Sequence, residues 1–149
     1  MKNWFRVLVA VWYLLGWILH VYLGLANPEI YRAFGETALL PGFDLIWQGF
    51  VMTRITAFAL VLAAFQLAVG LMLIGKRKWV KLGLVLSIGF NLFLIQLGLS
   101  IPAEDLSMDI YFNRFPNIVF VLLQAWLLFQ TYPETIYEMI RRNRESGKQ

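Results

Sequence analysis

Residues 57–81 are AFALVLAAFQLAVGLMLIGKRKWVK, an apolar run that meets a block of basic residues. The 21 residues from Ile55 to Gly75 carry no charge and a single amide, Gln66. At a rise of about 1.5 Å per residue, about 20 apolar residues cross a hydrocarbon layer roughly 30 Å thick. A surface helix of a soluble protein would carry a polar stripe, and this run has none. The stretch therefore predicts a membrane-spanning helix.

The basic block fixes the direction of that helix. Lys76, Arg77, Lys78 and Lys81 follow the apolar run directly. Loops rich in lysine and arginine stay on the cytoplasmic side, so this turn is expected to face inward. A second apolar stretch begins at Trp79, and such a short connection joins two antiparallel neighbours.

Composition limits the class of protein. Of 149 residues, 60% are hydrophobic and 15% charged, whereas soluble domains carry about 25% charged residues. The length suits a single domain, residues 1–149. With no cysteine and one histidine, the chain lacks the residues for disulfides, thiol redox chemistry or a metal site. The net charge of +4 comes from cations at predicted helix ends, so nucleic acid is not expected as a partner.

The whole chain predicts an all-α, polytopic membrane protein with four transmembrane helices in an antiparallel bundle. The spans are expected at about 5–26, 54–75, 79–101 and 115–132, with a cytoplasmic tail over 133–149. The first apolar run is too long for the core of a signal peptide and has no cleavage site, so it is expected to be retained. Pro102 is expected to end the third helix, and Pro116 and Pro133 to flank the fourth.

Residues 27–53 are too polar to span and are expected outside. Phe43, Ile46, Trp47 and Phe50 recur at i, i+3, i+4 and i+7. That spacing predicts a short amphipathic extracytoplasmic helix, which we expect along the outer membrane surface.

Charge distribution gives both termini a cytoplasmic location. Three cations, Arg32, Arg54 and Arg114, fall outside in this topology. Ten fall inside: Lys2, Arg6, Lys76, Arg77, Lys78, Lys81, Arg141, Arg142, Arg144 and Lys148. The excess follows the positive-inside rule.

Polar side chains within a bilayer are costly and need partners. Gln66, Asn91 and Gln124 all fall near mid-membrane on three different predicted helices. One interpretation is that they form interhelical hydrogen bonds, worth about 0.6 kcal/mol each. The other is that they form a polar floor beneath a ligand cavity.

A second group of polar and aromatic residues falls in the outer half. Tyr13, Trp17 and His20 share one helix face through their i, i+4, i+7 spacing. One interpretation of this group is structural: the arginines lie at the membrane boundary and the histidine is hydrogen-bonded within the protein. The other is functional: the group forms an outward-opening pocket for a quinone or another amphipathic lipid. The candidate ligand-binding residues are Tyr13, Trp17, His20, Arg54, Gln66, Asn91, Gln96, Arg114 and Gln124. No catalytic or metal-binding residue is predicted.

Residues 65–75, FQLAVGLMLIG, together with the basic turn and the glycine-bearing third helix, resemble the DoxX-like family of small four-helix membrane proteins. The resemblance implies a location in the cytoplasmic (inner) membrane of a bacterium or archaeon. It also implies association with quinone-linked oxidoreductases, as in the small subunit of a thiosulfate:quinone oxidoreductase, and quinone as the one cofactor suggested. The family pattern often has a glutamate where this chain has Gln66, and an amide exchanges no proton near neutral pH.

The function expected is that of an accessory or lipid- or quinone-binding subunit rather than an enzyme. The expected partners are the lipid bilayer and either a membrane redox complex or further copies of the chain. One alternative is a small membrane isomerase or oxidoreductase acting on a lipid ring; an isomerase would need an acid–base pair, and no carboxylate lies in the predicted spans. The other alternative is a purely structural assembly partner.

Overall fold

The computed structural model describes residues 2–101 and 105–146, and every regular element in this part of the chain is helical. Three elements are long: α1 (Lys2–Ala26), α4 (Ile55–Ile74) and α5 (Lys78–Leu97). Each lies in a helical run that is long and apolar enough to cross a membrane. The fourth, α7 (Phe115–Leu128), is shorter, but helical turns precede it in α6 (Leu106–Asp109) and η4 (Ile110–Arg114).

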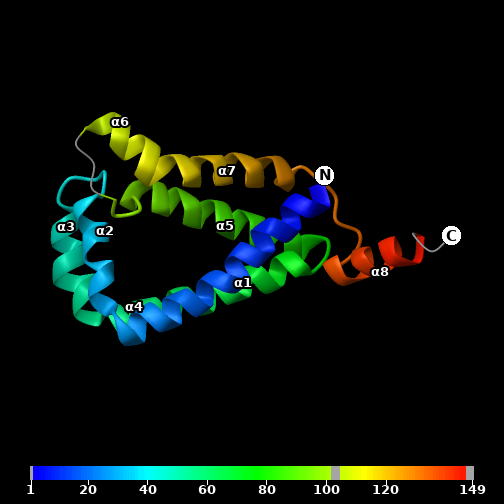
Figure 1. Ribbon diagram of the computed structural model, residues 1–149, viewed down its shortest axis with the longest axis horizontal. Helices are drawn as coiled ribbons and strands as arrows, with labels where there is room; N and C mark the ends of the chain where they lie inside the picture. Colours follow the sequence, from blue (N-terminus) through cyan, green and yellow to red (C-terminus); the bar gives the residue numbers. More distant parts are fainter. Residues whose placement is uncertain (1, 102–104, 147–149) are drawn as a thin grey trace.

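The long helices form two pairs (Figure 1). In one pair α4 runs back along α1, and in the other α7 runs back along α5. The pairs meet near the turn between α4 and α5 and diverge toward the opposite end, where α2 (Ala33–Glu36) and α3 (Phe43–Ile46) lie. The start of α1 and the C-terminal helix α8 (Ile136–Ser146) both lie at the end where the pairs meet.

Glycines bring α1 and α4 close together. A Cβ placed on Gly24 would lie 2.5 Å from the Cβ of Ala59, and one on Gly70 would lie 2.8 Å from the side chain of Leu14. Small residues at such contacts let helix backbones approach, and close packing is the main source of helix association in lipid.

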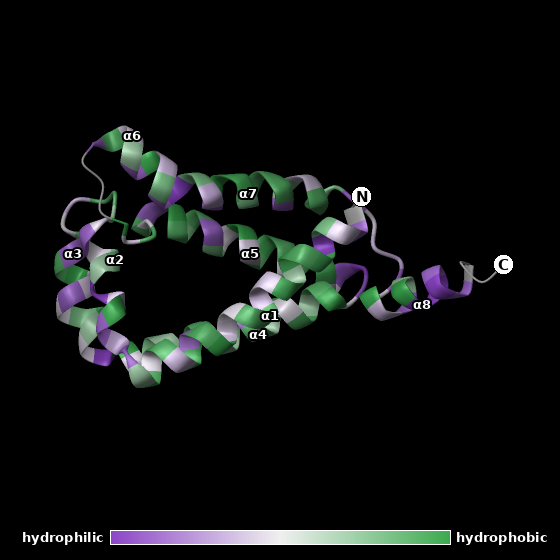
Figure 2. Ribbon diagram, in the orientation of Figure 1, coloured by the Kyte–Doolittle hydropathy of each residue, from purple (hydrophilic) through white to green (hydrophobic). Residues whose placement is uncertain are grey.

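Most residues along the long helices are hydrophobic (Figure 2), and many large apolar side chains are exposed on their outer sides. Two buried clusters fill the interior. One, nearer the termini, contains Val9, Ala10, Tyr13, Val69, Leu73, Val80, Leu84, Leu127, Tyr132, Ile136 and Met139. The other, under the α2–α3 end, contains Tyr31, Trp47, Met52, Ile55, Ala59 and Leu97. Because apolar residues are also exposed on the outside of the helices, a surrounding lipid phase is the environment that this surface suits.

The helices α1 and α4 begin and end within a few residues of the predicted spans 5–26 and 54–75, whereas the helices in the later two predicted spans end earlier. The helix predicted over 79–101 ends at Leu97, because Gly98 and Ser100 both have positive φ, +83° and +63°. Pro102, the predicted terminator, lies outside the described residues. The helix predicted over 115–132 ends at Leu128, four residues early.

The predicted amphipathic helix is not a separate surface element. After η1 (Pro28–Tyr31) and α2, the chain is helical through α3, η2 (Trp47–Val51) and η3 (Met52–Arg54) into α4. The helix bends at Arg54, whose φ of −133° is not helical. Trp47 is buried whereas Ile46 and Phe50 are exposed, so the four residues of the predicted face do not share one environment.

The tail predicted over 133–149 contains the helix α8 (Ile136–Ser146). Its first turn is a capping box: Thr135 Oγ1 accepts from the Glu138 amide at 3.1 Å, and Glu138 Oε2 accepts from the Thr135 amide at 2.7 Å. These hydrogen bonds lower the pKa of Glu138. The box satisfies two amide groups that a helix start leaves without backbone partners.

Candidate ligand-binding cleft

Two adjoining cavities lie between α1, α4 and α5, beneath the α2–α3 end of the molecule. Their volumes are 430 and 230 Å³. They share five lining residues, Tyr31, Trp47, Leu62, Phe90 and Phe93. We call this pair of cavities the cleft.

The larger cavity has a wholly apolar and aromatic lining apart from the tyrosine hydroxyl. Phe58, Val61 and Phe93 stand at its rim, and Val61 is 68% exposed. These residues are exposed on the outer sides of α4 and α5. The larger cavity therefore opens sideways, through the apolar surface of these helices.

The smaller cavity carries the polar groups. His20 Nδ1 lies 2.6 Å from the Tyr31 hydroxyl, and their rings are stacked with centroids 5.9 Å apart. Burial raises the pKa of Tyr31 to about 12, so its hydroxyl is neutral at physiological pH. The pair presents hydrogen-bonding groups to a wall that is mostly apolar.

Gln66 is the third polar group, and it is only 5% exposed. Its Oε1 has no hydrogen-bond partner among the described residues. It lies against α1 where a glycine leaves room: a Cβ on Gly16 would be 2.3 Å from that oxygen. A buried polar atom without a partner costs about 1–3 kcal/mol, so a ligand that donates to Gln66 would recover free energy.

The other two mid-membrane amides lie elsewhere, in a network that joins α1, α5 and α7. Asn91 Nδ2 donates to the Tyr13 hydroxyl at 3.0 Å and to the Ser87 carbonyl at 2.8 Å. Ser87 Oγ donates to Gln124 Oε1 at 2.9 Å. None of these side chains lines the cleft. Their geometry is that of interhelical hydrogen bonds, so the three amides form no common floor.

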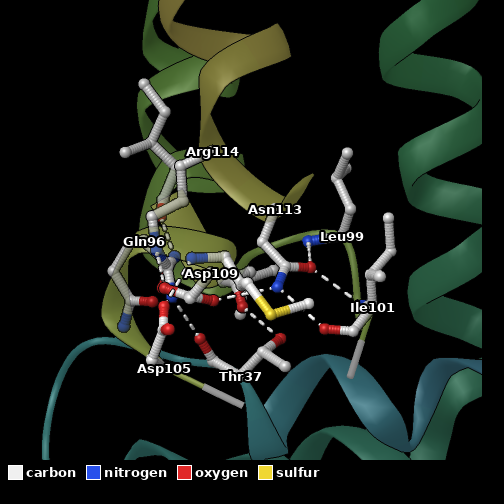
Figure 3. A network of polar contacts seen from close by, with 11 residues as sticks. Thr37, Gln96, Leu99, Ile101, Asp105, Asp109, Asn113 and Arg114 are labelled. Atoms are coloured by element: carbon white, nitrogen blue, oxygen red, sulfur yellow. Dashed lines mark hydrogen bonds and ion pairs between the residues drawn. The ribbon is translucent and has the colours of Figure 1, made fainter. Parts of the chain in front are cut away.

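Arg114 is buried in a network of its own (Figure 3). Its Nε donates to Asp109 Oδ2 at 2.7 Å, and its terminal nitrogens donate to the carbonyls of Thr37 at 2.6 Å, Gln96 at 3.4 Å and Ile95. These carbonyls include two from the last turn of α5, which Arg114 therefore caps. Its donors face protein oxygens rather than the cleft.

Asn113, beside Arg114, holds the chain that follows α5. Its Oδ1 accepts from the amides of Leu99 and Ile101 at 3.0 and 2.8 Å, and its Nδ2 donates to the Ile101 carbonyl at 2.9 Å (Figure 3). Gln96 lies at the same end of α5, and neither of its amide atoms has a partner among the described residues. Gln96 does not line the cleft.

The remaining candidates are at the surface or between helices. Trp17 is half-buried and lines neither cavity. Arg54 is exposed, donates to Thr53 Oγ1 and lies over the ring of Phe50, 5.0 Å from its centroid. Of the nine predicted residues, the structure brings only His20 and Gln66 together in the cleft.

The aromatic lining was missed from the sequence. Trp12, Tyr31 and Trp47 line the smaller cavity, whereas Trp17 and Tyr13 had been expected to do so. Trp12, Gly16 and His20 lie on one face of α1 through their i+4 spacing. No pattern of apolar residues distinguishes it, because α1 is apolar on all sides.

No group of three or more histidine, cysteine, aspartate or glutamate side chains that could hold a metal ion occurs among the described residues. Comparisons with protein families, with curated proteins and with solved structures gave no match. The resemblance to the DoxX-like family stays a prediction from residues 65–75 and the turn that follows.

Proposed function

We propose that this protein is a four-span, DoxX-like membrane protein that binds the ring of a quinone or a similar amphipathic lipid in the cleft, as an accessory rather than a catalytic subunit. The observation that carries the proposal is the unpaired Oε1 of Gln66, buried against Gly16 in the wall of the aromatic cavity that His20 and Tyr31 also line. A ligand that donates a hydrogen bond to this oxygen would satisfy it and so gain binding free energy.

The lining fits an amphipathic ring. Small-molecule sites are mostly apolar, with a few placed polar groups that orient the ligand, and measure about 300–1,000 Å³. Here Phe90, Phe93 and Trp47 supply flat apolar surface. His20 and Tyr31 could hold a ring carbonyl, and Gln66 would accept from a ring hydroxyl. A long apolar tail would leave through the sideways opening into the lipid.

Four spans with both termini cytoplasmic is the topology that fits the charges. Three helical runs are long enough to cross, and the α6–α7 run would supply the fourth crossing. Most of the cations lie at the end that holds the α4–α5 turn and α8, which the positive-inside rule assigns to the cytoplasm. We propose the cytoplasmic membrane of a bacterium or archaeon on the strength of the DoxX-like resemblance.

The cleft favours binding over catalysis. None of the residues that line it carries a carboxylate. His20 supplies the one imidazole of the lining, and it is hydrogen-bonded to Tyr31. Isomerisation of a lipid ring needs a proton donor and an acceptor placed on the substrate.

The test is native mass spectrometry of the detergent-extracted protein, followed by chemical identification of the lipids that it retains. We expect one quinone or isoprenoid lipid per chain, lost in Gln66→Leu and reduced in His20→Phe. Gln124→Leu is the matched control, because it also removes a buried mid-membrane amide but one outside the cleft. A ligand-free wild-type protein held in a larger complex, or equal retention by Gln66→Leu and wild type, would overturn the proposal.

A further inference from the structure

A separate cavity of 420 Å³ lies at the opposite end of the molecule from the cleft, beside the turn between α4 and α5. It is lined by Arg77, by Lys81 and by the connection 129–133 between α7 and α8. It shares no residue with the cleft. In the proposed topology it lies at the cytoplasmic membrane surface.

The cavity is positively charged because its acidic neighbours are already paired. Glu134 forms an ion pair with Arg142 at 2.8 Å, and Glu138 lies 3.5 Å from Lys76. Arg77 forms no ion pair with a carboxylate among the described residues. Lys81 likewise forms none, so among the described residues no acid neutralises the two cations that line the cavity.

The backbone holds the first of these cations in place at a conformational cost. Arg77 has φ +52°, a conformation that side-chain-bearing residues rarely adopt. Its amide donates to the Tyr132 carbonyl at 2.7 Å, which ties the turn to the far wall of the cavity. Residues in such conformations persist only where the surrounding structure holds them, and they are common at active sites and ligand-binding sites.

The second cation lies at the inner edge of the same cavity. The Lys81 ammonium donates to the Leu128 carbonyl, at the end of α7, and lies 5.8 Å from the centroid of the Tyr132 ring. An ammonium group has three donors, so this carbonyl leaves it donors for a further acceptor. The end of α7 and the cation that caps it thus form one wall of the cavity.

The apolar half of the site is Phe129, which is 85% exposed at the end of α7 and lines the same cavity. An exposed aromatic ring beside two cations matches a molecule with an anionic head and an acyl chain. Basic pockets between transmembrane helices on the cytoplasmic side bind the head groups of anionic lipids.

We infer that this cavity binds the phosphate of an anionic phospholipid from the cytoplasmic leaflet, with Arg77 and Lys81 on the phosphate and Phe129 beside the acyl chain. The site is independent of the cleft and of its ligand. It would hold a lipid against the joint between the two helix pairs.

The test uses the full chain in neutral detergent, titrated with phosphatidylglycerol, phosphatidylcholine or glycerol 1-phosphate and followed by native mass spectrometry. We expect one tightly held phosphatidylglycerol. Arg77→Gln should weaken it about fivefold, since one basic residue near a membrane surface contributes roughly a factor of that size. Arg144→Gln removes the same charge from α8, outside the cavity, and should leave the affinity unchanged.

Arg77→Gly separates binding from folding, because glycine accepts the positive φ without strain. This variant should resist unfolding at least as well as the wild type and still lose the lipid. Equal affinities for phosphatidylglycerol and phosphatidylcholine, or equal losses in Arg77→Gln and Arg144→Gln, would overturn the inference. Glycerol 1-phosphate binding as tightly as the lipid would also overturn it, because the site would then take a free phosphate ester.

Discussion

Replacing Arg6 with methionine tests whether a cation near the membrane surface holds the helices together. Arg6 is 1% exposed, and it donates to carbonyls in the last turn of α4: Leu73 at 2.7 Å, Ile74 at 3.0 Å and Gly75. A fourth bond, at 3.2 Å, reaches the Glu134 carbonyl that precedes α8. One side chain of α1 thus caps α4 and fixes the tail.

The magnitude follows from those bonds. A hydrogen bond to a charged group contributes about 1.5–3 kcal/mol, and a carbonyl left buried without a partner costs about 1–3 kcal/mol. Water at the membrane surface would reach some of the freed carbonyls. We therefore expect Arg6→Met to lower the free energy of unfolding by about 3–5 kcal/mol, which is at the upper end of the losses that single substitutions cause.

The assay is unfolding in mixed micelles by increasing amounts of dodecyl sulfate, followed by tryptophan fluorescence. Arg32→Met is the control, because Arg32 is exposed in an ion pair with Glu29 at 2.8 Å and such pairs contribute about 0–1 kcal/mol. If Arg6→Met costs no more than Arg32→Met, Arg6 is only a topological charge and the capping argument is wrong.

Three further predictions concern packing, the polar network and the tail. Gly70→Ala should destabilise the protein, because its Cβ would lie 2.8 Å from Leu14, whereas Gly89→Ala meets nothing within 4 Å and should not; thermal unfolding compares the two. Asn91→Leu should lower the free energy of unfolding by about 0.6–1.7 kcal/mol in the same micelle assay, the range for membrane interhelical hydrogen bonds, and an unchanged value would contradict the network. The capping box lowers the pKa of Glu138, so its contribution to α8 is complete above the ordinary glutamate pKa and fades as the pH falls below it; circular dichroism should show helix loss on acidification that is absent in Glu138→Gln.

The apolar runs and the residues that end them predicted the first two long helices closely, since a continuous apolar stretch and a basic turn are local features of the sequence. The ends of the later two were misplaced. Positive φ at Gly98 and Ser100 stops α5 early, and the Asn113 side chain holds that backbone through contacts 12 and 14 residues away in the sequence. Contacts of that kind leave no local pattern.

The candidate site was predicted only in part. His20 and Gln66 line the cleft. Asn91 and Gln124 instead form hydrogen bonds within and between helices. Arg114 caps the last turn of α5. Periodicity identifies the buried face of a helix when the other face is polar. A helix that is apolar all round gives no such indication, so the rotation of α1, and with it the choice of Trp12 over Trp17, could not be inferred.

The sequence alone determined the environment and the helical class, because free energies of transfer into lipid depend on composition and length along the chain. It also placed the cations at the ends of helices. Only the tertiary structure decided which of those cations are buried caps, such as Arg6, and which are exposed, such as Arg77. It also decided that Gln66 meets Gly16 and stays unpaired. Those outcomes depend on helix rotation and on contacts distant in sequence, which in lipid are set by close packing rather than by a hydrophobic stripe.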